Sequence, residues 1–465
     1  MFGRVKRIHL VGIGGTGMSG IAEILINLGL EVTGSDTKLT EVTDRLVSLG
    51  AEIAEGHGGR LVAAADVAVV SSAIGAANPE IRLAHKSGVP VIPRAEMLAE
   101  LMRLKRGIAI GGAHGKTTTT WLTALVLAEA GFDPTIVVGG RLKTLGTNAR
   151  LGRGDLLVAE ADESDGTFLM LTPTVAVVTN IDREHLDFYE DFDAIKDAFL
   201  RFMNRVPFFG VAVANADDEA LRELLPRVTR RVTTFGIDRE ADLRAEEVKV
   251  RGRTTRFSVR AFGGLLGEAE LHVPGLYNVR NALAAVAVGL EVGAPFEKIA
   301  AGIAAFEGIH RRLEIKGERS GRTVIDDYGH HPTEIRATLQ AIRQAYPERR
   351  VVVLFQPHRY TRTSKLLGEF STAFEGADRL FLLDIYPASE TPIPGVDSGL
   401  LAKAIREAGG DDPEWIRERS DAAERVAAES AEGDVIVTLG AGDVSRSGEA
   451  ILEAIGRREG GGGRG

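Results

Sequence analysis

Cysteine is absent from this chain of 465 residues. Its absence excludes disulfide bonds, thiolate nucleophiles and zinc sites that depend on cysteine ligands. The chain also lacks any uncharged apolar run of the roughly 18 residues that a membrane-spanning helix needs. Glycines interrupt the apolar segment near the start and no small-residue cleavage site follows it, so we expect a first β-strand there rather than a signal peptide. These absences predict a cytoplasmic protein that has no membrane partner.

An excess of basic charge is missing as well. The chain has 56 basic and 65 acidic residues and a formal net charge of −9, which argues against a nucleic-acid partner. A local basic patch could still hold an anionic ligand. The hydrophobic fraction of 44% and the charged fraction of 26% are ordinary for a globular protein. At roughly 150 residues per domain, the length suggests about three domains.

Short apolar strands alternate with helices along most of the chain, which predicts parallel sheets with helices on their faces. Between residues 230 and 273 the pattern changes to alternating segments separated by turns, which predicts a small antiparallel patch. The expected strands lie at residues 7–11, 32–35, 67–70, 89–92, 108–110, 156–159, 175–179, 323–326, 351–355, 380–383 and 435–439, and the expected helices include residues 18–28 and 116–130. We therefore predict three successive α/β domains over residues 1–105, 106–311 and 312–458, with a flexible glycine-rich tail at 459–465.

A phosphate-binding loop is predicted at residues 112–119, GAHGKTTT, between a strand and a helix. Its glycines let several backbone N–H groups face one anion, and the helix adds its positive end. Lys116 can reach the β- and γ-phosphates, and the Thr117 hydroxyl is placed for Mg²⁺. The usual spacing has a glycine at the position of Ile110, so the loop is a shortened variant. The alternative is a glycine-rich turn with a solvated lysine, but a run of threonines is a poor start for an ordinary helix.

Two acidic segments follow predicted strands, at residues 160–165 and 179–187. Because the carboxyl ends of parallel strands share one edge of a sheet, we expect both segments to face the phosphate loop. Mg²⁺ takes one or two carboxylates together with phosphate oxygens and waters. Glu160 is the best candidate carboxylate, and His185 could complete a second metal site. For most of the other acids, a solvated loop is the simpler interpretation.

The glycine loop at residues 12–17, GIGGTG, resembles a dinucleotide-binding fingerprint. Asp36 stands at the end of the next strand, where a ribose-binding acid would lie. This pattern supports a second hypothesis, a nicotinamide-dependent oxidoreductase. A hydride-transfer enzyme does not need the separate phosphate loop with its lysine, which argues against that hypothesis. A catalytically inactive nucleotide-binding module is a further alternative.

Other candidate ligand-binding side chains lie in the last two-fifths of the chain. Asn278 and Asn281 open an alanine-rich helix, and an amide suits an adenine edge because it both donates and accepts, although Asn278 could equally cap the helix. The segments at 310–312, 326–332 and 356–362 are dense in donors that grip carboxylates and phosphates. We expect Arg359 and Arg362 to contact a ligand.

Together, the segments HLVGIGGTGMSG, GGAHGKTTTT, EADESD, TNIDREHLD, IDDYGHHPTE and FQPHRYTR resemble the Mur ligase family over residues 6–443. The resemblance implies an N-terminal Rossmann-like domain that binds a UDP substrate, a central P-loop ATPase-like domain and a C-terminal Rossmann-like domain. It implies an ATP-dependent ligase with two Mg²⁺ ions. The most similar branch joins L-alanine to the lactyl carboxylate of UDP-N-acetylmuramate through an acyl phosphate. A sibling that attaches a ready-made tripeptide during wall recycling is the alternative, and FQPHRYTR favours a small amino acid.

The resemblance also assigns site residues. Those implied for ATP are Gly112, Ala113, His114, Gly115, Lys116, Thr117, Thr118, Asn278, Asn281, Arg312 and Asp327. Those implied for the UDP substrate are Gly14, Gly15, Thr16, Gly17, Asp36, Ser71, Ser72, Thr147 and Asn148. Those implied for the amino acid are Tyr328, His330, Arg359 and Arg362. Those implied for the metals are Thr117, Glu160 and His185, and those implied for catalysis are Lys116, His185 and Glu160.

Two positions depart from the family pattern. Ala113 stands where threonine is usual, and Tyr277 stands where histidine is usual beside the adenine-binding asparagine. Neither change removes a phosphate or metal ligand. Phe199 occupies the position of a carbamoylated lysine in sibling ligases, with Lys196 the only lysine nearby, and the alanine-adding branch does not need that lysine. For assembly, we expect a monomer or a weak homodimer.

Overall fold

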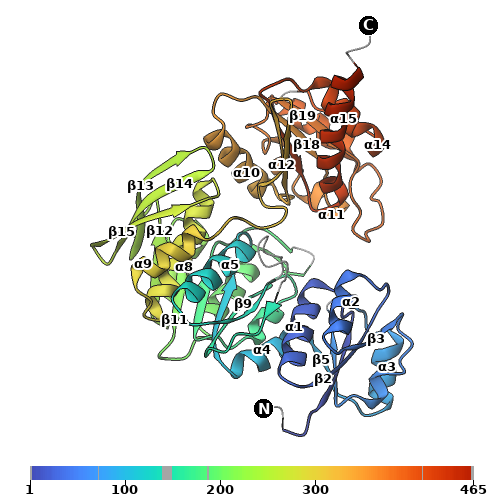
Figure 1. Cartoon of the computed structure of the whole chain (residues 1–465), viewed down its shortest axis with the longest axis vertical. Coiled ribbons are helices and arrows are strands. Elements are labelled where there is room, and N and C mark those ends of the chain that lie inside the picture. The colour runs from blue at the N-terminus through green and yellow to red at the C-terminus, as the bar shows by residue number, and fades with distance from the viewer. Residues whose placement is uncertain (1–2, 72, 139–148, 186–187, 411, 462–465) are drawn as a thin grey trace. The chain divides into compact units, whose positions relative to one another are not determined.

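The structure is a computed structural model that describes residues 3–71, 73–138, 149–185, 188–410 and 412–461 (Figure 1). The chain divides into two compact units. The first unit comprises residues 1–248, 256–271 and 278–307, and the second comprises residues 249–255, 272–277 and 308–465. Within the described ranges, no helix is both long enough and apolar enough to cross a membrane.

The first unit begins with a five-stranded parallel sheet in the order β3-β2-β1-β4-β5. The strands β1 and β4 are almost wholly buried, as expected where helices cover both faces of a parallel sheet. Its strands are β1 (Arg7–Val11), β2 (Glu31–Asp36), β3 (Glu52–Glu55), β4 (Val67–Val70) and β5 (Val91–Pro93). Its helices are α1 (Thr16–Asn27), α2 (Glu41–Ser48), α3 (Pro79–Lys86) and α4 (Arg94–Arg103), with a 3₁₀ turn η1 (Val62–Ala64).

The strand predicted at residues 89–92 lies two residues further on. The Val89 N–H donates to the Ala84 carbonyl and so closes the end of α3, which leaves β5 to begin at Val91. The helix predicted at residues 18–28 begins earlier, at Thr16, directly after the glycine loop. The strand at 7–11 is confirmed.

A second sheet in the first unit has ten strands in the order β15-β14-β13-β12-β11-β10-β6-β9-β7-β8. Its strands are β6 (Arg106–Gly111), β7 (Thr135–Val137), β8 (Ala149–Arg150), β9 (Leu156–Glu160), β10 (Val175–Val178), β11 (Val211–Asn215), β12 (Val232–Gly236), β13 (Leu243–Arg251), β14 (Thr254–Ala261) and β15 (Gly264–Leu271). The accompanying helices are α5 (Lys116–Glu129), α6 (Phe192–Met203), α7 (Glu219–Leu224), α8 (Leu276–Glu291) and α9 (Phe296–Ala304), with η2 (Thr167–Met170) and η3 (Leu225–Arg227).

The parallel part of this sheet extends further than the sequence predicts. Strand β12, which lies inside the predicted antiparallel patch, pairs in parallel with both β11 and β13. Beyond it, β14 and β15 form a hairpin whose turn residues, Phe262 and Gly263, both have positive φ. Such a turn matches the twist of paired antiparallel strands. The antiparallel patch therefore begins only after β12.

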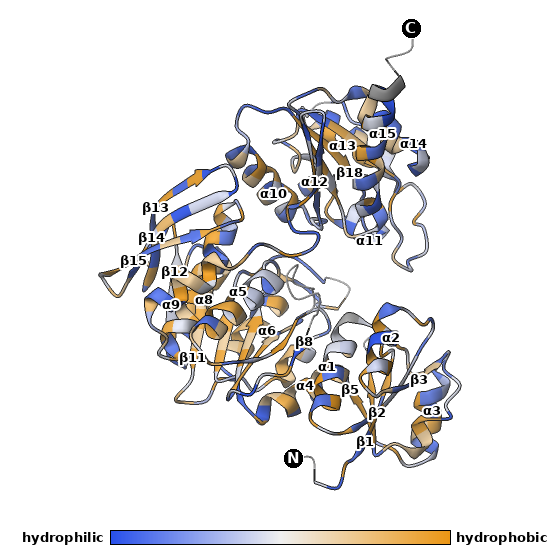
Figure 2. Cartoon of the chain, in the orientation of Figure 1, coloured by the Kyte–Doolittle hydropathy of each residue, from blue (hydrophilic) through white to orange (hydrophobic). Residues whose placement is uncertain are grey.

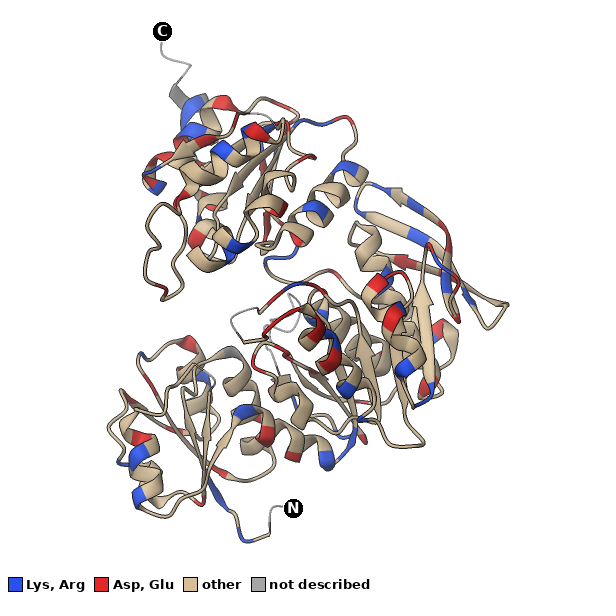
Figure 3. Ribbon diagram, turned by 180° about the vertical axis from the view of Figure 1, so that it is seen from behind, with Lys and Arg blue, Asp and Glu red and all other residues tan. Residues whose placement is uncertain are grey.

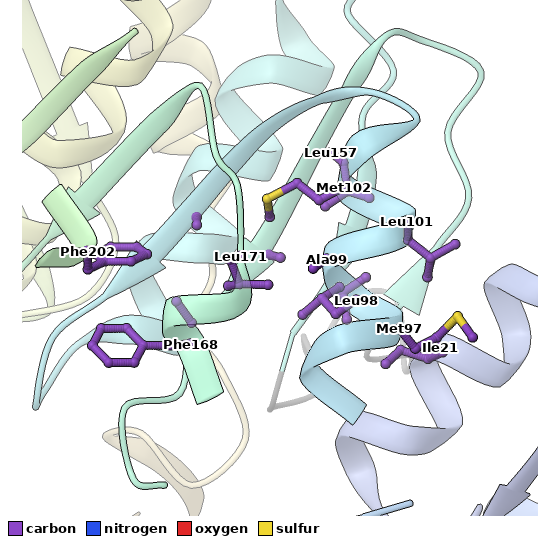
Figure 4. Close-up of a cluster of buried hydrophobic side chains, with 14 of the residues drawn as sticks. Ile21, Met97, Leu98, Ala99, Leu101, Met102, Leu157, Phe168, Leu171 and Phe202 are labelled. Atoms are coloured by element: carbon purple, nitrogen blue, oxygen red, sulfur yellow. The ribbon is translucent and has the colours of Figure 1, made fainter. Parts of the chain in front are cut away.

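One hydrophobic core joins the two sheets of the first unit. Helix α4 contributes Leu98 and Met102, which pack in the same cluster as Leu157 of β9 and Phe168 of η2 (Figure 4). Each of these side chains is 3% exposed or less. Fully burying one such side chain contributes roughly 1.5–3 kcal/mol. The core therefore fixes α4, and the glycine loop that α4 adjoins, relative to β9.

The second unit contains a six-stranded sheet in the order β16-β17-β21-β18-β19-β20. Strand β16, which the sequence analysis missed, is an antiparallel edge, and the other pairs are parallel. The strands are β16 (Glu314–Arg319), β17 (Arg322–Asp327), β18 (Val351–Phe355), β19 (Arg379–Leu383), β20 (Glu414–Ile416) and β21 (Val435–Leu439). The helices are α10 (Pro332–Ala345), α11 (Tyr360–Lys365), α12 (Leu367–Ser371), α13 (Ser398–Glu407), α14 (Arg419–Glu429) and α15 (Ser447–Gly461), with η4 (Asp443–Arg446).

Separate hydrophobic clusters cover the two faces of this sheet. In the hydropathy colouring, strands of this sheet are apolar and the surrounding helices carry polar segments (Figure 2). Helix α15 runs to Gly461, three residues into the segment predicted to be a tail. Acidic and basic residues are interspersed over the helices of both units in the view of Figure 3, which agrees with the absence of a basic excess.

A buried charge network supports the carboxyl edge of the first sheet. Glu80 of α3 lies 3.5 Å from His9 Nε2 and 3.2 Å from His57 Nδ1, and it accepts a hydrogen bond from Ser35. Burial alone would raise the pKa of Glu80, but the hydrogen bonds from His9 and Ser35 outweigh it and lower the pKa to about 2. Glu80 is therefore ionised at neutral pH. Ser35 connects this network to the glycine loop, because its carbonyl accepts from the N–H groups of Gly12 and Ile13.

Candidate nucleotide and metal site

The phosphate loop lies between β6 and α5, as the sequence predicts. Gly112 has φ +132° and Gly115 has φ +81°, and a Cβ on Gly112 would overlap the Thr179 hydroxyl. Only glycine accepts both the backbone angle and the close approach. The segment after β10 holds the loop in place, because Asn180 Oδ1 accepts from His114 N at 2.8 Å and Thr179 Oγ1 donates to the His114 carbonyl at 2.6 Å.

Lys116 folds back over this loop. Its Nζ donates to the carbonyl oxygens of Gly112 at 2.6 Å and Ala113 at 3.0 Å, and to Glu163 Oε1 at 3.0 Å. Burial would lower the pKa of Lys116, but the charges of Glu163 and Asp162 outweigh it and raise that pKa. An ammonium has three donors, and these three acceptors use all of them. A phosphate oxygen that binds Lys116 therefore replaces an acceptor of the protein itself.

Glu163 is a functional candidate that the sequence analysis did not single out. Its side chain is 2% exposed and lies between two predicted catalytic groups, with Oε1 3.3 Å from His185 Nε2 and Oε2 2.9 Å from Lys116 Nζ. The Tyr189 hydroxyl donates to the Glu163 carbonyl at 2.7 Å and so fixes its backbone. The motif EADESD placed this glutamate among several acids, and nothing in the local pattern distinguished the one that points inward.

The predicted metal ligands fall into two groups. Thr117 Oγ1 donates to Glu160 Oε2 at 3.1 Å, so the loop hydroxyl and the carboxylate after β9 are adjacent. His185 lies instead with Glu163 and Glu184, whose ligand atoms are all within 4.8 Å of one another. Burial would lower the pKa of His185, but the hydrogen bond that His185 donates to Glu163 and the charge of Glu184 raise it. The hydroxyl and carboxylate oxygens fit the ligand preference of Mg²⁺.

Asn278 and Asn281, the two candidate adenine-binding amides, lie beside the phosphate loop. Asn278 and Asn281 are each 5% exposed, and Asn281 Nδ2 lies 3.4 Å from Asn278 Oδ1. A Cβ on Gly115 would stand 2.6 Å from Asn281 Oδ1, so the amide packs directly on the loop. Because α8 already begins at Leu276, Asn278 is inside the helix and the capping interpretation is wrong.

The N-terminal glycine loop and Asp36 also meet. Gly14 N donates to Asp36 Oδ2 at 2.8 Å, which ties the loop to the end of β2. Ser71, Gly15 and Gly17 line a common cavity of about 220 Å³. Thr16 opens α1, and its side chain lies outside the described residues, as do Ser72, Thr147 and Asn148. The predicted UDP-site residues that are described therefore lie along one loop and its neighbouring strand ends.

Three sequence models of one family cover most of the chain. "Mur ligase family, catalytic domain" matches residues 7–106, "Mur ligase middle domain" matches residues 110–289, and "Mur ligase, glutamate ligase domain" matches residues 311–442. A UDP-N-acetylmuramate–L-alanine ligase of Geobacter sp. (strain M21) is 55% identical over 97% of this chain and 98% of its own length. The chain belongs to the Mur ligase family. The oxidoreductase interpretation of the N-terminal glycine loop is therefore wrong.

Solved structures of Mur ligases share the fold. UDP-N-acetylmuramate–alanine ligase from Thermotoga maritima has a TM-score of 0.80 and 28% identity, and the match covers 98% of this chain and 100% of that one. A murein peptide ligase from Psychrobacter arcticus has a TM-score of 0.68 and 26% identity, with 97% and 99% covered. A second relative, from Trichlorobacter lovleyi, carries the L-alanine ligase name at 54% identity over 98% of this chain and 100% of its own. The three-domain α/β architecture is confirmed.

In the second unit of this Mur ligase, Asp327 and Arg312 lie together at the end of β17. Asp327 is 2% exposed and accepts from Leu313 N and Gly329 N, each at 2.8 Å. Burial raises the pKa of Asp327 although the charge of Arg312 opposes it. Arg312 Nη1 lies 3.2 Å from Glu334 Oε1. Asp327 thus orders the loop that follows β17.

The predicted amino-acid residues cluster around a histidine that the sequence analysis passed over. The His358 ring lies 5.6 Å from that of His330, which lies 5.2 Å from the Tyr328 ring. His358 stacks on Tyr386, and its Nδ1 is 3.3 Å from Arg362 Nη1. Burial and the positive charges of its neighbours lower the pKa of His358 to about 3. The ring is therefore neutral at physiological pH and can accept a hydrogen bond.

Arg359 has a strained backbone in the same cluster. Its φ is +70°, in the left-handed region, and it directly precedes α11. Its N–H donates to the Tyr386 carbonyl at 2.9 Å, which holds the backbone in this conformation. Strain of this kind is concentrated at functional sites, where it orients a side chain.

Proposed function

We propose that this Mur ligase joins L-alanine to the lactyl carboxylate of UDP-N-acetylmuramate, with ATP converted to ADP and phosphate. The observation that carries the proposal is near-full-length identity of 53–55% to eight proteins that bear the L-alanine ligase name. The murein peptide ligase of Psychrobacter arcticus is a more distant structural match, which favours a single amino acid over a tripeptide as the second substrate. A cytoplasmic location follows from the need for ATP.

The reaction has two steps in this proposal. A carboxylate oxygen of UDP-N-acetylmuramate first attacks the γ-phosphorus of ATP, and the bond to ADP breaks. The amine nitrogen of alanine then attacks the acyl carbon of the resulting acyl phosphate, and phosphate leaves. A carboxylate alone is a poor acylating agent, and its phosphorylation supplies the leaving group. Catalysis consists largely of positioning and charge neutralisation, as in other phosphoryl transfers.

Residues of the first unit hold the phosphates in this proposal. Lys116 places its ammonium on the transferred phosphate, and the backbone N–H groups of the loop bind the neighbouring oxygens. Thr117 and Glu160 would hold one Mg²⁺, and His185, which Glu163 positions, would hold a second. When bound, these ions neutralise charge on the transferred phosphoryl group. Asn278 and Asn281 provide the amides for adenine.

Residues of the second unit receive the amino acid and part of the nucleotide. Arg359 and Arg362 supply guanidinium groups for the alanine carboxylate, which they can bind in a bidentate way. Tyr328 and His330 lie in the same cluster and limit the room beside them. Arg312 and Asp327 are assigned to ATP.

Isotope transfer tests the acyl-phosphate step. UDP-N-acetylmuramate labelled with ¹⁸O in its carboxylate is incubated with ATP, Mg²⁺ and L-alanine, and the released phosphate is analysed by mass spectrometry. One labelled oxygen per phosphate is expected, because the attacking carboxylate oxygen stays on phosphorus when the amine displaces it. Unlabelled phosphate formed together with the alanine adduct would reject this mechanism.

A further inference from the structure

The loop that follows β19, residues 384–390, lies beside the segment that carries the two arginines proposed to bind the amino acid. Parallel pairing of β18 and β19 continues into both segments, because His358 and Tyr386 form a bridge beyond the ends of these strands. Tyr386 N donates to the Pro357 carbonyl at 2.8 Å, and the Tyr386 carbonyl accepts from Arg359 N at 2.9 Å. The 384–390 loop therefore determines where the backbone of Arg359 lies.

A strained turn closes the 384–390 loop. Glu390 N donates to the Pro387 carbonyl at 2.9 Å, and the two residues between them, Ala388 and Ser389, have φ of +47° and +72°. Residues with a Cβ rarely adopt this left-handed conformation, and turns of this kind usually contain glycine, asparagine or aspartate. Strained backbone persists where the surrounding contacts hold it, and the Glu390 side chain makes such contacts.

Glu390 directs both of its carboxylate oxygens at one residue of α11. The Thr361 N–H donates to Oε2 at 3.1 Å, and the Thr361 hydroxyl donates to Oε1 at 2.6 Å. Thr361 is the second residue of α11, and its N–H is one of the donors at a helix start that have no partner inside the helix. Hydrogen bonds to a carboxylate are roughly twice as strong as those between neutral groups. Glu390 therefore fixes the first turn of α11, which contains Arg362.

The 384–390 loop also reaches the side chain of Arg362. The Tyr386 ring stacks on the His358 ring, with 5.6 Å between the ring centroids and 9° between the ring planes. His358 Nδ1 in turn lies 3.3 Å from Arg362 Nη1. The start of the loop is anchored separately, because Trp415 Nε1 of β20 donates to Asp384 Oδ1 at 2.7 Å. Backbone and side-chain contacts of this one loop thus converge on the two arginines.

We propose that Glu390 is a positioning residue for the amino-acid substrate. This inference rests on the proposed function. Each guanidinium presents its donors in a rigid plane, so two of them bind one carboxylate well only when their relative placement is fixed. The Tyr386 carbonyl fixes the backbone that carries Arg359, and Glu390 fixes the turn that carries Arg362. Glu390 acts on the substrate only through Thr361 and α11.

Steady-state kinetics with two nucleophiles test the proposal. Hydroxylamine, like L-alanine, attacks the acyl carbon through nitrogen and displaces phosphate, but it leaves a hydroxamate and has no carboxylate to bind. Glu390→Gln is expected to raise the KM for L-alanine about 10-fold, because the amide group replaces one of the two charged acceptors with a donor that faces Thr361. Phosphate release with hydroxylamine, and the KM for ATP, should stay within about twofold of the parent values.

Three further variants separate positioning from folding. Glu390→Asp keeps the carboxylate at a shorter reach and should recover part of the lost alanine affinity. Thr361→Val should also raise the KM for L-alanine, and combining it with Glu390→Gln should cost less than the sum of the single changes, because both remove the same contact. Glu375→Gln changes an exposed glutamate elsewhere in the second unit and should match the parent protein with both nucleophiles.

Two results would overturn the proposal and leave the proposed function intact. An unchanged KM for L-alanine in Glu390→Gln would show that Glu390 does not position the arginines. Equal losses with L-alanine and hydroxylamine would show that Glu390 only supports the fold. If the parent protein uses L-alanine but not hydroxylamine, the KM for ATP replaces that comparison, and a rise as large as that for L-alanine would overturn the proposal.

A parent protein that releases phosphate with neither nucleophile would refute the proposed function, and this inference with it. Thermal denaturation monitors the folding of each variant. If Glu390→Gln does not fold, Thr361→Val decides the question, because it removes the hydroxyl contact and leaves Glu390 in place. An unchanged KM for L-alanine in Thr361→Val would then overturn the proposal.

Discussion

Replacing Lys116 with alanine is expected to lower kcat about a thousandfold, the range found when one group that neutralises transition-state charge is removed. Lys116 is the cation that the phosphate loop itself carries, and its Nζ reaches two loop carbonyls and Glu163. We expect the loop backbone to survive this loss, because Thr179 and Asn180 also hold it through hydrogen bonds with His114. The measurement is phosphate release under saturating substrates.

Lys196→Ala is the matched control for this variant. Lys196 lies on α6 and pairs with Asp193 and Glu223 near the surface. Phe199, which the family resemblance aligns with the lysine of sibling ligases, is buried at 1% exposure. We expect Lys196→Ala to retain full turnover. A Lys116→Ala protein with near-normal turnover, or a Lys196→Ala protein as impaired as Lys116→Ala, would contradict the assignment.

Replacing Glu163 with glutamine is expected to lower kcat about 10- to 100-fold, the range measured when a residue that orients a metal ligand is changed. Glu163 is the buried carboxylate between Lys116 Nζ and His185 Nε2. Glutamine keeps the size of the side chain but removes the negative charge that balances both groups. Both the lysine and the histidine should then lose their fixed positions.

The KM for L-alanine separates this effect from general damage. The proposed alanine residues belong to the second unit, so Glu163→Gln should leave that KM within about twofold while kcat falls. Glu163→Asp restores the charge at a shorter reach and should recover part of the turnover. The steady-state kinetics of both variants check this. A normal kcat in Glu163→Gln would contradict a role for the Glu163 carboxylate in the site. An equal loss of kcat in Glu163→Asp and Glu163→Gln would contradict it as well.

Local features of the fold were predictable from the sequence. The phosphate loop follows from glycines between an apolar strand and a helix, and the structure confirms β6, the loop and α5. The sequence-based predictions were wrong where pairing with a strand distant in the sequence determines the direction or the existence of a strand. Strand β12 lies inside the segment that was predicted to be antiparallel but pairs in parallel with β11. Strand β16 was missed because its segment, EIKGER, is polar and forms an edge strand whose last two residues are exposed.

The sequence predicted which segments form the site, but it did not predict which side chains within those segments point into it. The acids after β9 look alike in sequence, yet Glu163 is buried, and its carbonyl accepts from the hydroxyl of Tyr189, which lies 26 positions later. His358 meets Tyr386 because β18 and β19 end at the same edge, a pairing that no local pattern reveals.

The central claim is that the amine substrate is L-alanine, and its most direct test is phosphate release from ATP, Mg²⁺ and UDP-N-acetylmuramate with L-alanine present or omitted. The account predicts release that depends on alanine, together with a product heavier than UDP-N-acetylmuramate by one alanyl residue. Release that does not respond to alanine, but begins when the wall tripeptide is supplied, would contradict the account and assign the chain to the recycling branch of the family.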